Sequence, residues 1–294
     1  MVDGILNVNK PGGKTSFSMV AMVKRLTGER HVGHAGTLDP AATGVLPICL
    51  GQGTRVIEFL VEATKAYRAE IELGISTDTY DGSGKVVQKQ EPPVISRDQL
   101  KSALASFCGL IRQTPPMYSA VKYHGKPLYK LARAGLTVER RSRWAKVLSL
   151  ELVDWQSPVA TIEVVCGKVT YIRSLAHDLG QALGCGAYLK SLIRLRCGPF
   201  GIRDAVPMPQ LEDACHYGYW PQLVYPMDSV LLHWAAMVVS ADAEQSVRHG
   251  RPLFWEGEPS SENRCRIYAL DGRFLGVLRF NPEKGQWQPE KVFS

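Results

Sequence analysis

The segment HVGHAGTLDPAATGVLPICLGQGTRV, residues 31–56, contains five glycines and two prolines. Few of its positions suit a regular element, so the sequence predicts a long loop with short strand pieces. Loops of this length inside compact domains are usually either functional or disordered. The apolar character of VLPICL, residues 45–50, argues against disorder. We therefore expect an ordered loop that carries function.

One carboxylate, Asp39, lies among the glycines of this loop, beside a histidine and a proline. Pro40 biases Asp39 toward an extended backbone, and the glycines allow another molecule to approach closely. These features suit a rigidly held nucleophile or base, although Asp-Pro also commonly opens a turn. No second carboxylate is near in sequence, which speaks against a paired-acid hydrolase. The simplest signatures of ATP binding, dinucleotide binding and serine esterases are absent.

The residues before the loop predict a strand, a turn and a helix. GILNVNKP, residues 4–11, has the pattern of a short strand that runs into a turn. Thr15 or Ser16 caps the expected helix over 16–28, whose apolar residues recur every three or four positions and which ends at Gly28.

The residues after the loop mix strands with helices. AYRAEIELGISTDTYDGSGKVV, residues 66–87, alternates as a strand does and predicts a hairpin turn through 81–84. The further expected elements are a helix over 96–109 capped at Ser96, two strands over 149–167 and a helix over 171–184. Strands from distant parts of the chain mixed with helices predict an α+β domain.

The length of 294 residues suits about two domains of roughly 150 residues each. From Trp234 onward the sequence predicts short strands broken by Gly and Asp turns, which form a small β-rich unit. We therefore expect a larger domain over residues 1–233 and a small one over 234–294.

Composition excludes several classes of protein. Hydrophobic residues make up 45% and charged residues 21%, which are ordinary globular values. No apolar run approaches the roughly 18 to 20 residues of a membrane span, and MVDGILNVNKPGG lacks the pattern of a signal peptide, so we expect a cytoplasmic protein. The seven cysteines, without a C-x-x-C pair, indicate reduced thiols rather than a disulfide scaffold or a zinc site.

The net charge of +7 is concentrated in residues 121–146, where Glu139 is the lone acid. The basic residues of this segment are Lys122, Lys126, Lys130, Arg133, Arg140, Arg141, Arg143 and Lys146. Cations displace counterions from phosphates, and the interleaved aromatic residues can stack on bases. The segment therefore suits a polyanion-binding surface, and a solvated basic face without a partner is the alternative.

GHAGTLDPAATGVLP, residues 33–47, resembles the catalytic-aspartate motif of the TruB family, the bacterial tRNA pseudouridine-55 synthases. The resemblance continues in order through NVNKPGGKTS (7–16), KAYRAEIELGISTDTYDGSG (65–84), QTPPMYSAVKYHGKPLYKLARAG (113–135), GKVTYIRSLAHDLG (167–180) and AYLKSLIRLRCGPF (187–200). These six blocks cover most of residues 4–200, whereas a single block would only be suggestive.

The resemblance implies an enzyme that isomerises uridine 55 in the T-loop of tRNA to pseudouridine, on a flipped-out nucleotide, with no metal or organic cofactor. It implies a pseudouridine synthase domain with a mixed, largely antiparallel sheet and a basic tRNA-binding insertion at about residues 110–146. The C-terminal unit resembles a PUA-type RNA-binding domain weakly. Nothing in the sequence demands an obligate protein partner or more than a monomer.

The resemblance also assigns roles to residues. Asp39 matches the attacking aspartate, Arg173 the arginine that pairs with it, and Tyr67 the tyrosine that packs on the uracil and is favoured for proton handling. His34 matches the histidine that fills the space vacated by the flipped nucleotide. The other candidate substrate-binding residues are Lys10, Pro11, Lys65, Tyr171, Leu192, Lys126, Lys130 and Arg133.

The chemistry of the reaction agrees with these roles. A carboxylate can attack the sugar or the base, or remove a ribose proton, without a metal. An enclosed carboxylate is costly to ionise unless it is paired, so we expect Arg173 to keep the pKa of Asp39 low. Stacking of the uracil on Tyr67 contributes about 1 to 3 kcal/mol, which helps to offset the cost of unstacking.

Two alternatives stay open. The chain departs from the family where an Arg-Arg-Thr run is common, because Ile193 and Leu195 replace the first and third residues and leave Arg194. One alternative is a guide-RNA-dependent ribosomal RNA pseudouridine synthase, against which Ala35 and the compact tail count. The other is a non-catalytic tRNA-binding protein or folding chaperone, which the presence of all the matched catalytic residues argues against.

Overall fold

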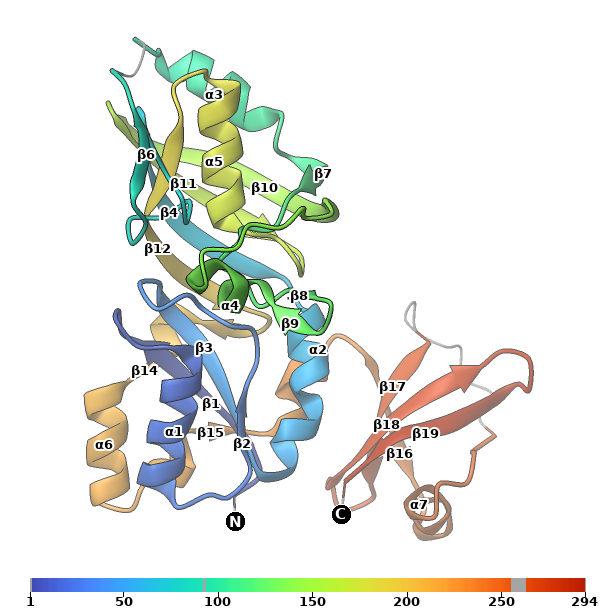
Figure 1. The fold of residues 1–294 in the computed structure, drawn as a ribbon. Coiled ribbons are helices and arrows are strands. Elements are labelled where there is room, and N and C mark those ends of the chain that lie inside the picture. Colours follow the sequence, from blue (N-terminus) through green and yellow to red (C-terminus); the bar gives the residue numbers. More distant parts are fainter. Residues whose placement is uncertain (1, 92–93, 255–262, 294) are drawn as a thin grey trace.

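The structure is a computed structural model that describes residues 2–91, 94–254 and 263–293. An eleven-stranded sheet runs through the larger part of the molecule (Figure 1). Its main path contains β1 (Gly4–Lys10), β3 (Thr43–Leu50), β4 (Lys65–Leu73), β7 (Gly109–Gln113), β10 (Arg143–Gln156), β11 (Val159–Cys166), β12 (Ala187–Cys197) and β14 (Val206–Pro207). The spatial order is β14-β1-β3-β12-β4-β11-β10-β7.

Neighbouring strands of this path are antiparallel except at two places. The parallel pairs are β1 with β14 and β3 with β12. Three short strands extend the sheet, namely β2 (Val32–His34) on β3, β13 (Phe200–Gly201) on β12 and β15 (Val224–Tyr225) on β1. The prediction of a mixed, largely antiparallel sheet is confirmed.

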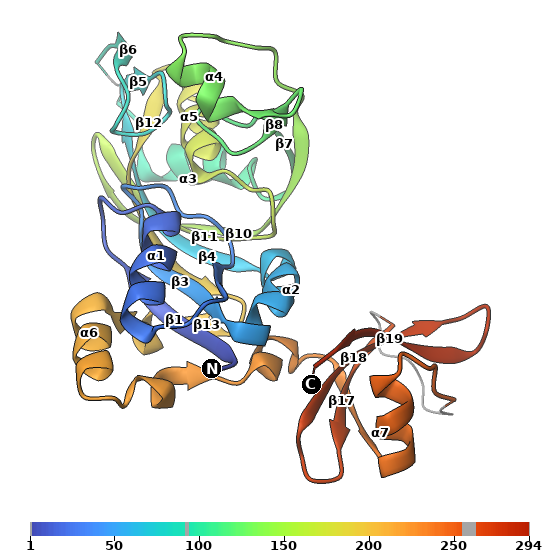
Figure 2. The same ribbon diagram turned by 60° about the horizontal axis from the view of Figure 1, so that its bottom comes forward.

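Helices cover the sheet in two groups, which Figures 1 and 2 show from two directions. The α-helices of the large domain are α1 (Ser16–Thr27), α2 (Ile57–Glu62), α3 (Arg97–Ala105), α4 (Leu128–Arg133), α5 (Ile172–Ala182) and α6 (Met208–His216). The 3-10 helices are Gly51–Val56, Ile202–Asp204, Trp220–Leu223 and Met227–Leu231. No helix in these parts of the chain is long and apolar enough to cross a membrane.

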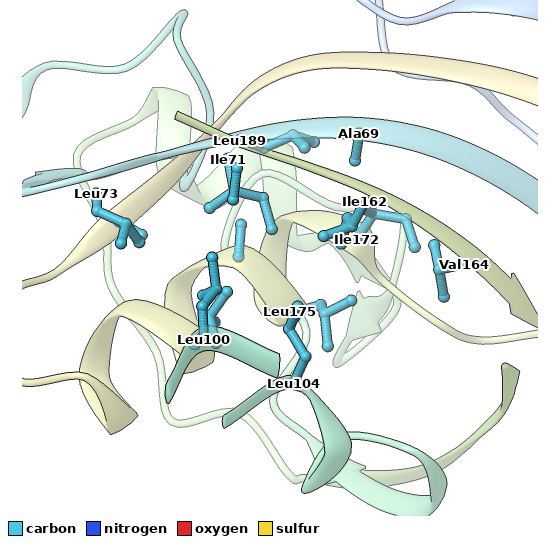
Figure 3. Packing of buried hydrophobic residues seen from close by; sticks show 14 of the residues in the cluster. Ala69, Ile71, Leu73, Leu100, Leu104, Ile162, Val164, Ile172, Leu175 and Leu189 are labelled. Atoms are coloured by element: carbon cyan, nitrogen blue, oxygen red, sulfur yellow. The ribbon is translucent and has the colours of Figure 1, made fainter. Parts of the chain in front are cut away.

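The upper half of the large domain in Figure 1 contains β4, β10 and β11. Its core lies between the sheet and helices α3 and α5 (Figure 3). Leu100 and Leu104 of α3 and Leu175 of α5 pack against Ile71 of β4 and Ile162 of β11, and all five side chains are buried. Each such side chain stabilises the fold by about 1.5 to 3 kcal/mol. This packing fixes α5 on the sheet and therefore fixes the functional residues at its N-terminal end.

Both ends of the first predicted helix and the start of the second agree with the structure, whereas the second helix ends at Ala105 rather than at 109. Helix α1 has Thr15 as its N-cap and Gly28, at φ 73°, as its C-cap. Helix α3 begins with a capping box between Ser96 and Gln99, as the spacing of a serine and a glutamine suggests.

The long loop expected over residues 31–56 is largely regular structure, so that prediction is wrong. Strand β3 covers eight of these residues, and its last seven are all buried. A strand between two partners in a covered sheet reads as a continuous apolar run, so it lacks the alternation that marks a half-exposed strand. Residues 35–42, between β2 and β3, are the part without a helix or strand.

Two small hairpins project from the large domain. One joins β5 (Ile75–Thr77) to β6 (Val86–Lys89), as predicted for the turn through 81–84. The other joins β8 (Lys122–Tyr123) to β9 (Lys126–Pro127) and leads into α4. This second hairpin and α4 carry much of the basic segment.

The C-terminal residues form a small β domain, as predicted (Figure 1). Its sheet contains, in spatial order, β16 (Ala235–Val239), β17 (Arg264–Ala269), β18 (Phe274–Asn281) and β19 (Gln286–Val292). Strands were expected throughout residues 235–253, but α7 (Ala241–Arg248) lies there, capped by the Ser240 side chain. A domain boundary near residue 233 stays a prediction.

The small domain packs on the large one. Trp234 and Phe293 share a buried cluster with Phe59 and Leu60 of α2. The rings of Phe59 and Trp234 meet edge to face, with centroids 5.1 Å apart.

Candidate active site

The loop over residues 35–42 is held from both sides. The Ser16 side chain at the start of α1 donates to the Leu38 carbonyl at 3.2 Å and accepts from the Leu38 N–H at 2.9 Å. The Gly13 N–H donates to the Pro40 carbonyl at 2.9 Å. The backbone on each side of Asp39 is therefore fixed to the segment that enters α1.

Arg173 of α5 forms a two-point ion pair with Asp39. The guanidinium Nε lies 2.8 Å from Oδ2, and Nη2 donates to Oδ1 at 3.0 Å. The Arg173 side chain is only 6% exposed, whereas that of Asp39 is 38% exposed. The arginine is therefore enclosed by protein, while the carboxylate that it holds stays open to a ligand.

The remaining donors of Arg173 bind two other segments. Nη2 also donates to the Tyr118 carbonyl at 2.9 Å, and Nη1 donates to the Thr79 carbonyl at 3.4 Å. Nη1 lies 3.6 Å from Oδ2 of Asp81. One guanidinium thus joins the aspartate loop, the turn after β5 and the residues just before the basic segment.

Asp81 is a site residue that sequence reasoning missed. The run TYDGSG predicts a turn, and Asp81 does accept hydrogen bonds within it, from Thr79 Oγ1 at 2.7 Å and from the Ser83 N–H at 3.0 Å. Its second oxygen faces Arg173. Asp39 and Asp81 are far apart in sequence. A search for a second acid close to Asp39 in the sequence therefore does not find Asp81.

The pKa of Asp39 is raised, so the expectation that Arg173 keeps it low is wrong. Burial by the surrounding loops raises the pKa, and the negative charge of Asp81 raises it further. The Arg173 charge and hydrogen bonds act in the opposite direction but do not outweigh burial. The sequence does not show that Asp81 lies near Asp39, so its effect on the pKa of Asp39 could not be anticipated.

Two predicted substrate-binding lysines are buried and bind backbone carbonyls. Lys10 Nζ donates to the carbonyls of Pro11 at 2.9 Å, Lys14 at 2.6 Å and Pro40 at 3.1 Å. Burial lowers the pKa of Lys10 to about 8, although Asp39 opposes this. Lys10 thereby ties the predicted Pro11 turn to the residue after Asp39.

Lys65 binds the last turn of α2. Its Nζ donates to the carbonyls of Leu60 at 3.2 Å, Val61 at 2.6 Å and Ala63 at 2.6 Å. Burial lowers the pKa of Lys65. Its three donors are occupied within the protein, and a direct substrate contact stays a prediction.

The predicted ring residues lie on different elements. Tyr67, on β4, pairs across the sheet with Arg194 of β12, and burial raises the pKa of Tyr67 to about 12. Its hydroxyl is therefore protonated at neutral pH. His34 ends β2, its Nδ1 is buried with no hydrogen-bond partner in the described structure, and burial lowers its pKa.

Tyr171 and Leu192 support the site through the backbone and the core. The Tyr171 N–H donates to Gln113 Oε1 at 3.0 Å and its carbonyl accepts from Gln113 Nε2 at 3.2 Å. Burial also raises the pKa of Tyr171. Half-buried Leu192 packs against the core clusters of both halves of the sheet.

The predicted basic residues Lys126, Lys130 and Arg133 are all exposed. The Arg133 guanidinium lies 5.5 Å from the centre of the Tyr129 ring. Other residues of the basic segment line a cavity of about 510 Å³, among them Lys122, Tyr123, His124, Arg140, Arg141 and Arg143. Positive charge and aromatic surface therefore occur together here, as the sequence indicated.

Family models match most of the large domain. Residues 24–172 match TruB family pseudouridylate synthase (N terminal domain), and residues 173–232 match tRNA pseudouridylate synthase B C-terminal domain. A protein of Dehalococcoides mccartyi named tRNA pseudouridine synthase B is 42% identical, over 99% of this chain and 97% of that protein. One of Pseudomonas aeruginosa with the same name is 40% identical, over 94% of this chain and 91% of that protein.

Solved structures share the fold along nearly the whole chain. A crystal structure of a Cbf5-Nop10-Gar1 complex matches with a TM-score of 0.78 and 28% identity, over 99% of this chain and 85% of that chain. An H/ACA RNP bound to a substrate RNA containing 2'-deoxyuridine matches with a TM-score of 0.76 and 25% identity, with the same coverage.

The position of Asp81 predicts how the Asp39 carboxyl titrates. In carbon-13 NMR of the protein with labelled aspartate, the Asp39 carboxyl should titrate at a higher pH than an ordinary aspartate, because burial raises its pKa. Asp81→Asn should lower that midpoint, because it removes a like charge.

Asp98→Asn, at an exposed position in the first turn of helix α3, is the control and should leave the midpoint unchanged, and Asp39→Asn identifies the resonance. An Asp39 midpoint that rises or stays in place in Asp81→Asn contradicts this electrostatic account.

Proposed function

The chain belongs to the TruB family of pseudouridylate synthases, and we propose that it modifies uridine 55 in the T-loop of tRNA with Asp39 as the nucleophile. It is a pseudouridine synthase that acts on tRNA, because relatives named tRNA pseudouridine synthase B match nearly the full chain at about 40% identity. The T-loop position and the role of Asp39 are the finer statements that the proposal adds.

One observation carries the assignment of Asp39, namely the two-point ion pair between a half-open carboxylate and an enclosed arginine. Arg173 favours the ionised form that nucleophilic attack needs, and it fixes the direction in which the carboxylate oxygens point. The other polar contacts of the guanidinium leave it little freedom to follow a substrate. Asp39 is therefore the reacting group and Arg173 its fixed partner.

The reaction needs no net change of charge or oxidation state. The N1–C1′ bond breaks, a C5–C1′ bond forms, the C5 proton leaves and N1 gains a proton. Asp39 attacks either C1′ of the ribose or C6 of the base, or it removes a ribose proton, and any of these routes uses its carboxylate. Tyr67 offers its ring as a stacking surface for the uracil and a protonated hydroxyl for proton handling.

The other proposed residues act around this centre. His34, neutral because burial lowers its pKa, fills the space that the flipped nucleotide leaves. Lys10, Pro11, Lys65 and Tyr171 shape the pocket, and Leu192 contributes apolar surface beside Tyr67.

The basic segment binds the tRNA arm in this proposal. Lys126, Lys130 and Arg133 position the RNA through phosphates rather than reading bases. The residues from 234 onward add an RNA-binding domain to the catalytic domain over 1–233. A cytoplasmic location, a monomeric state and independence from an obligate protein partner stay predictions.

The guide-RNA-dependent alternative has weaker support. The Cbf5 and H/ACA structures are 28% and 25% identical to this chain. The proteins named tRNA pseudouridine synthase B reach 40% and 42%.

Asp39→Asn tests the assigned nucleophile. We expect it to abolish pseudouridine formation on an unmodified T-arm stem-loop, because an amide cannot replace the attacking carboxylate, while the Kd for the stem-loop stays within about threefold. The product is measured by mapping pseudouridine in the RNA, and parental enzyme should modify position 55. Asp98→Asn, an exposed acid on α3, serves as the control with parental activity. Product formed by Asp39→Asn at the parental rate would remove the assignment.

The basic segment predicts the salt dependence of binding. Replacing Lys126, Lys130 and Arg133 together with glutamine should weaken tRNA binding and reduce the slope of log Kd against log salt by about 0.7 to 0.9 for each phosphate that is no longer neutralised. The same replacement of Lys24, Lys89 and Lys101, which are equally exposed, is the charge-matched control. An unchanged slope in the first variant, or an equal change in the control, would place the phosphate surface elsewhere.

A further inference from the structure

Arg194 is a buried cation beside the active site that the mechanism does not yet use. Its side chain is 1% exposed, so it cannot touch a substrate from its position in β12. Nε donates to the Val45 carbonyl at 2.6 Å, and Nη2 donates to the Gly36 carbonyl at 3.1 Å. These two carbonyls lie at the two ends of the segment that carries Asp39.

No carboxylate of the described residues lies within ion-pair distance of Arg194. A buried cation without an anionic partner is costly, and hydrophobic replacements of buried charges are often tolerated or stabilising. Stability therefore gives little reason to keep an arginine at this position. Its contacts give a functional reason.

The backbone around Arg194 is built for close approach. In the sheet, Arg194 pairs with Gly44 of β3 on one side and with Tyr67 of β4 on the other. A Cβ on Gly44 would lie 2.3 Å from the Arg194 carbonyl oxygen, and one on Gly36 would lie 3.3 Å from Nη1. Both glycines have positive φ, at 101° and 77°, so glycine is required there for two reasons.

We infer that Arg194 is a positioning residue that sets the aspartate loop and the Tyr67 ring in one fixed geometry for the reaction. Its side chain fastens both ends of the loop, and its backbone fixes the register of Tyr67 opposite that loop. The charge of Arg194 reaches the same groups, since it lowers the pKa values of Lys10, His34 and Lys65 and opposes the rise at Tyr67.

This inference rests on the proposed role of Asp39 and adds a separate requirement to it. Arg173 pairs with the carboxylate directly, whereas Arg194 acts on the backbone from behind the loop. Removal of the Arg194 guanidinium should therefore misplace Asp39 while leaving the RNA-binding surface intact. The expected result is a lower single-turnover rate without a matching loss of affinity for the RNA.

The test uses Arg194→Met and Arg194→Lys in the full-length protein. Single-turnover rates on the T-arm stem-loop should fall by about 100-fold in Arg194→Met, the size of effect that a displacement of about 1 Å produces. Arg194→Lys should recover part of the rate, because one ammonium can bind one of the two carbonyls but not span both. The Kd for the stem-loop should stay within about threefold in both variants.

Arg196→Met is the matched control. Arg196 lies two residues further along β12, and its guanidinium binds Thr64 Oγ1 at 3.3 Å and the Gly198 carbonyl at 3.1 Å, away from the aspartate loop. This variant shows how far the rate changes when any arginine is removed from β12. Its single-turnover rate should stay near the parental value. A folded Arg194→Met with a single-turnover rate within threefold of the parent, or no lower than that of Arg196→Met, overturns the inference.

If Arg194→Met does not fold, Arg194→Lys is the test of the inference. A parental single-turnover rate in Arg194→Lys overturns it. Failure here is distinguishable from failure of the proposed function. Full activity in Asp39→Asn would overturn the nucleophile itself, whereas an inactive Asp39→Asn beside a fully active Arg194→Met would overturn only the role of Arg194.

Discussion

The ion pair between Arg173 and Asp39 is the interaction on which the active site depends. It joins α5, which belongs to the upper half of the sheet, to a loop of the lower half, across 134 residues of sequence. The arginine is anchored by carbonyls of Thr79 and Tyr118, so the carboxylate inherits a fixed position. Because the pair is closed on the arginine side and open on the aspartate side, the site can remain charged and still receive a nucleotide.

Three buried cations around this ion pair bind backbone carbonyls. Lys10, Lys65 and Arg194 each donate to backbone oxygens of a neighbouring segment. Each one fixes a segment next to the site, and Lys10 also offsets part of the negative charge of Asp39. The charged donors are held in place by several backbone carbonyls, and fixed charges and dipoles are what electrostatic preorganisation requires.

The sequence predicts much of the fold and part of the site. Local signals suffice for helices whose starts are marked by caps, as at Thr15, and the α+β class follows from the pattern. The mixed, largely antiparallel sheet is what the family resemblance implies. Strand β3 escapes prediction because it is covered on both faces. Helix α7 lies where strands were expected, although its Ser240 N-cap and its Ala, Glu, Gln and Arg residues favour a helix. Asp39 and Arg173 could be paired through the family resemblance, whereas Asp81 could not, since its contact depends on folding alone. The raised pKa of Asp39 follows from burial and from the negative charge of Asp81, which together outweigh the opposing charges of Arg173 and Lys10.

The most direct test of the central claim is the single-turnover rate of Arg173→Ala on the T-arm stem-loop, with its Kd measured in parallel. The account predicts a rate about 100- to 1,000-fold below the parent, the range expected when a preorganised charge partner is removed, with affinity within about threefold. A folded variant that forms pseudouridine within threefold of the parental rate would contradict the claim that this arginine holds the reacting carboxylate.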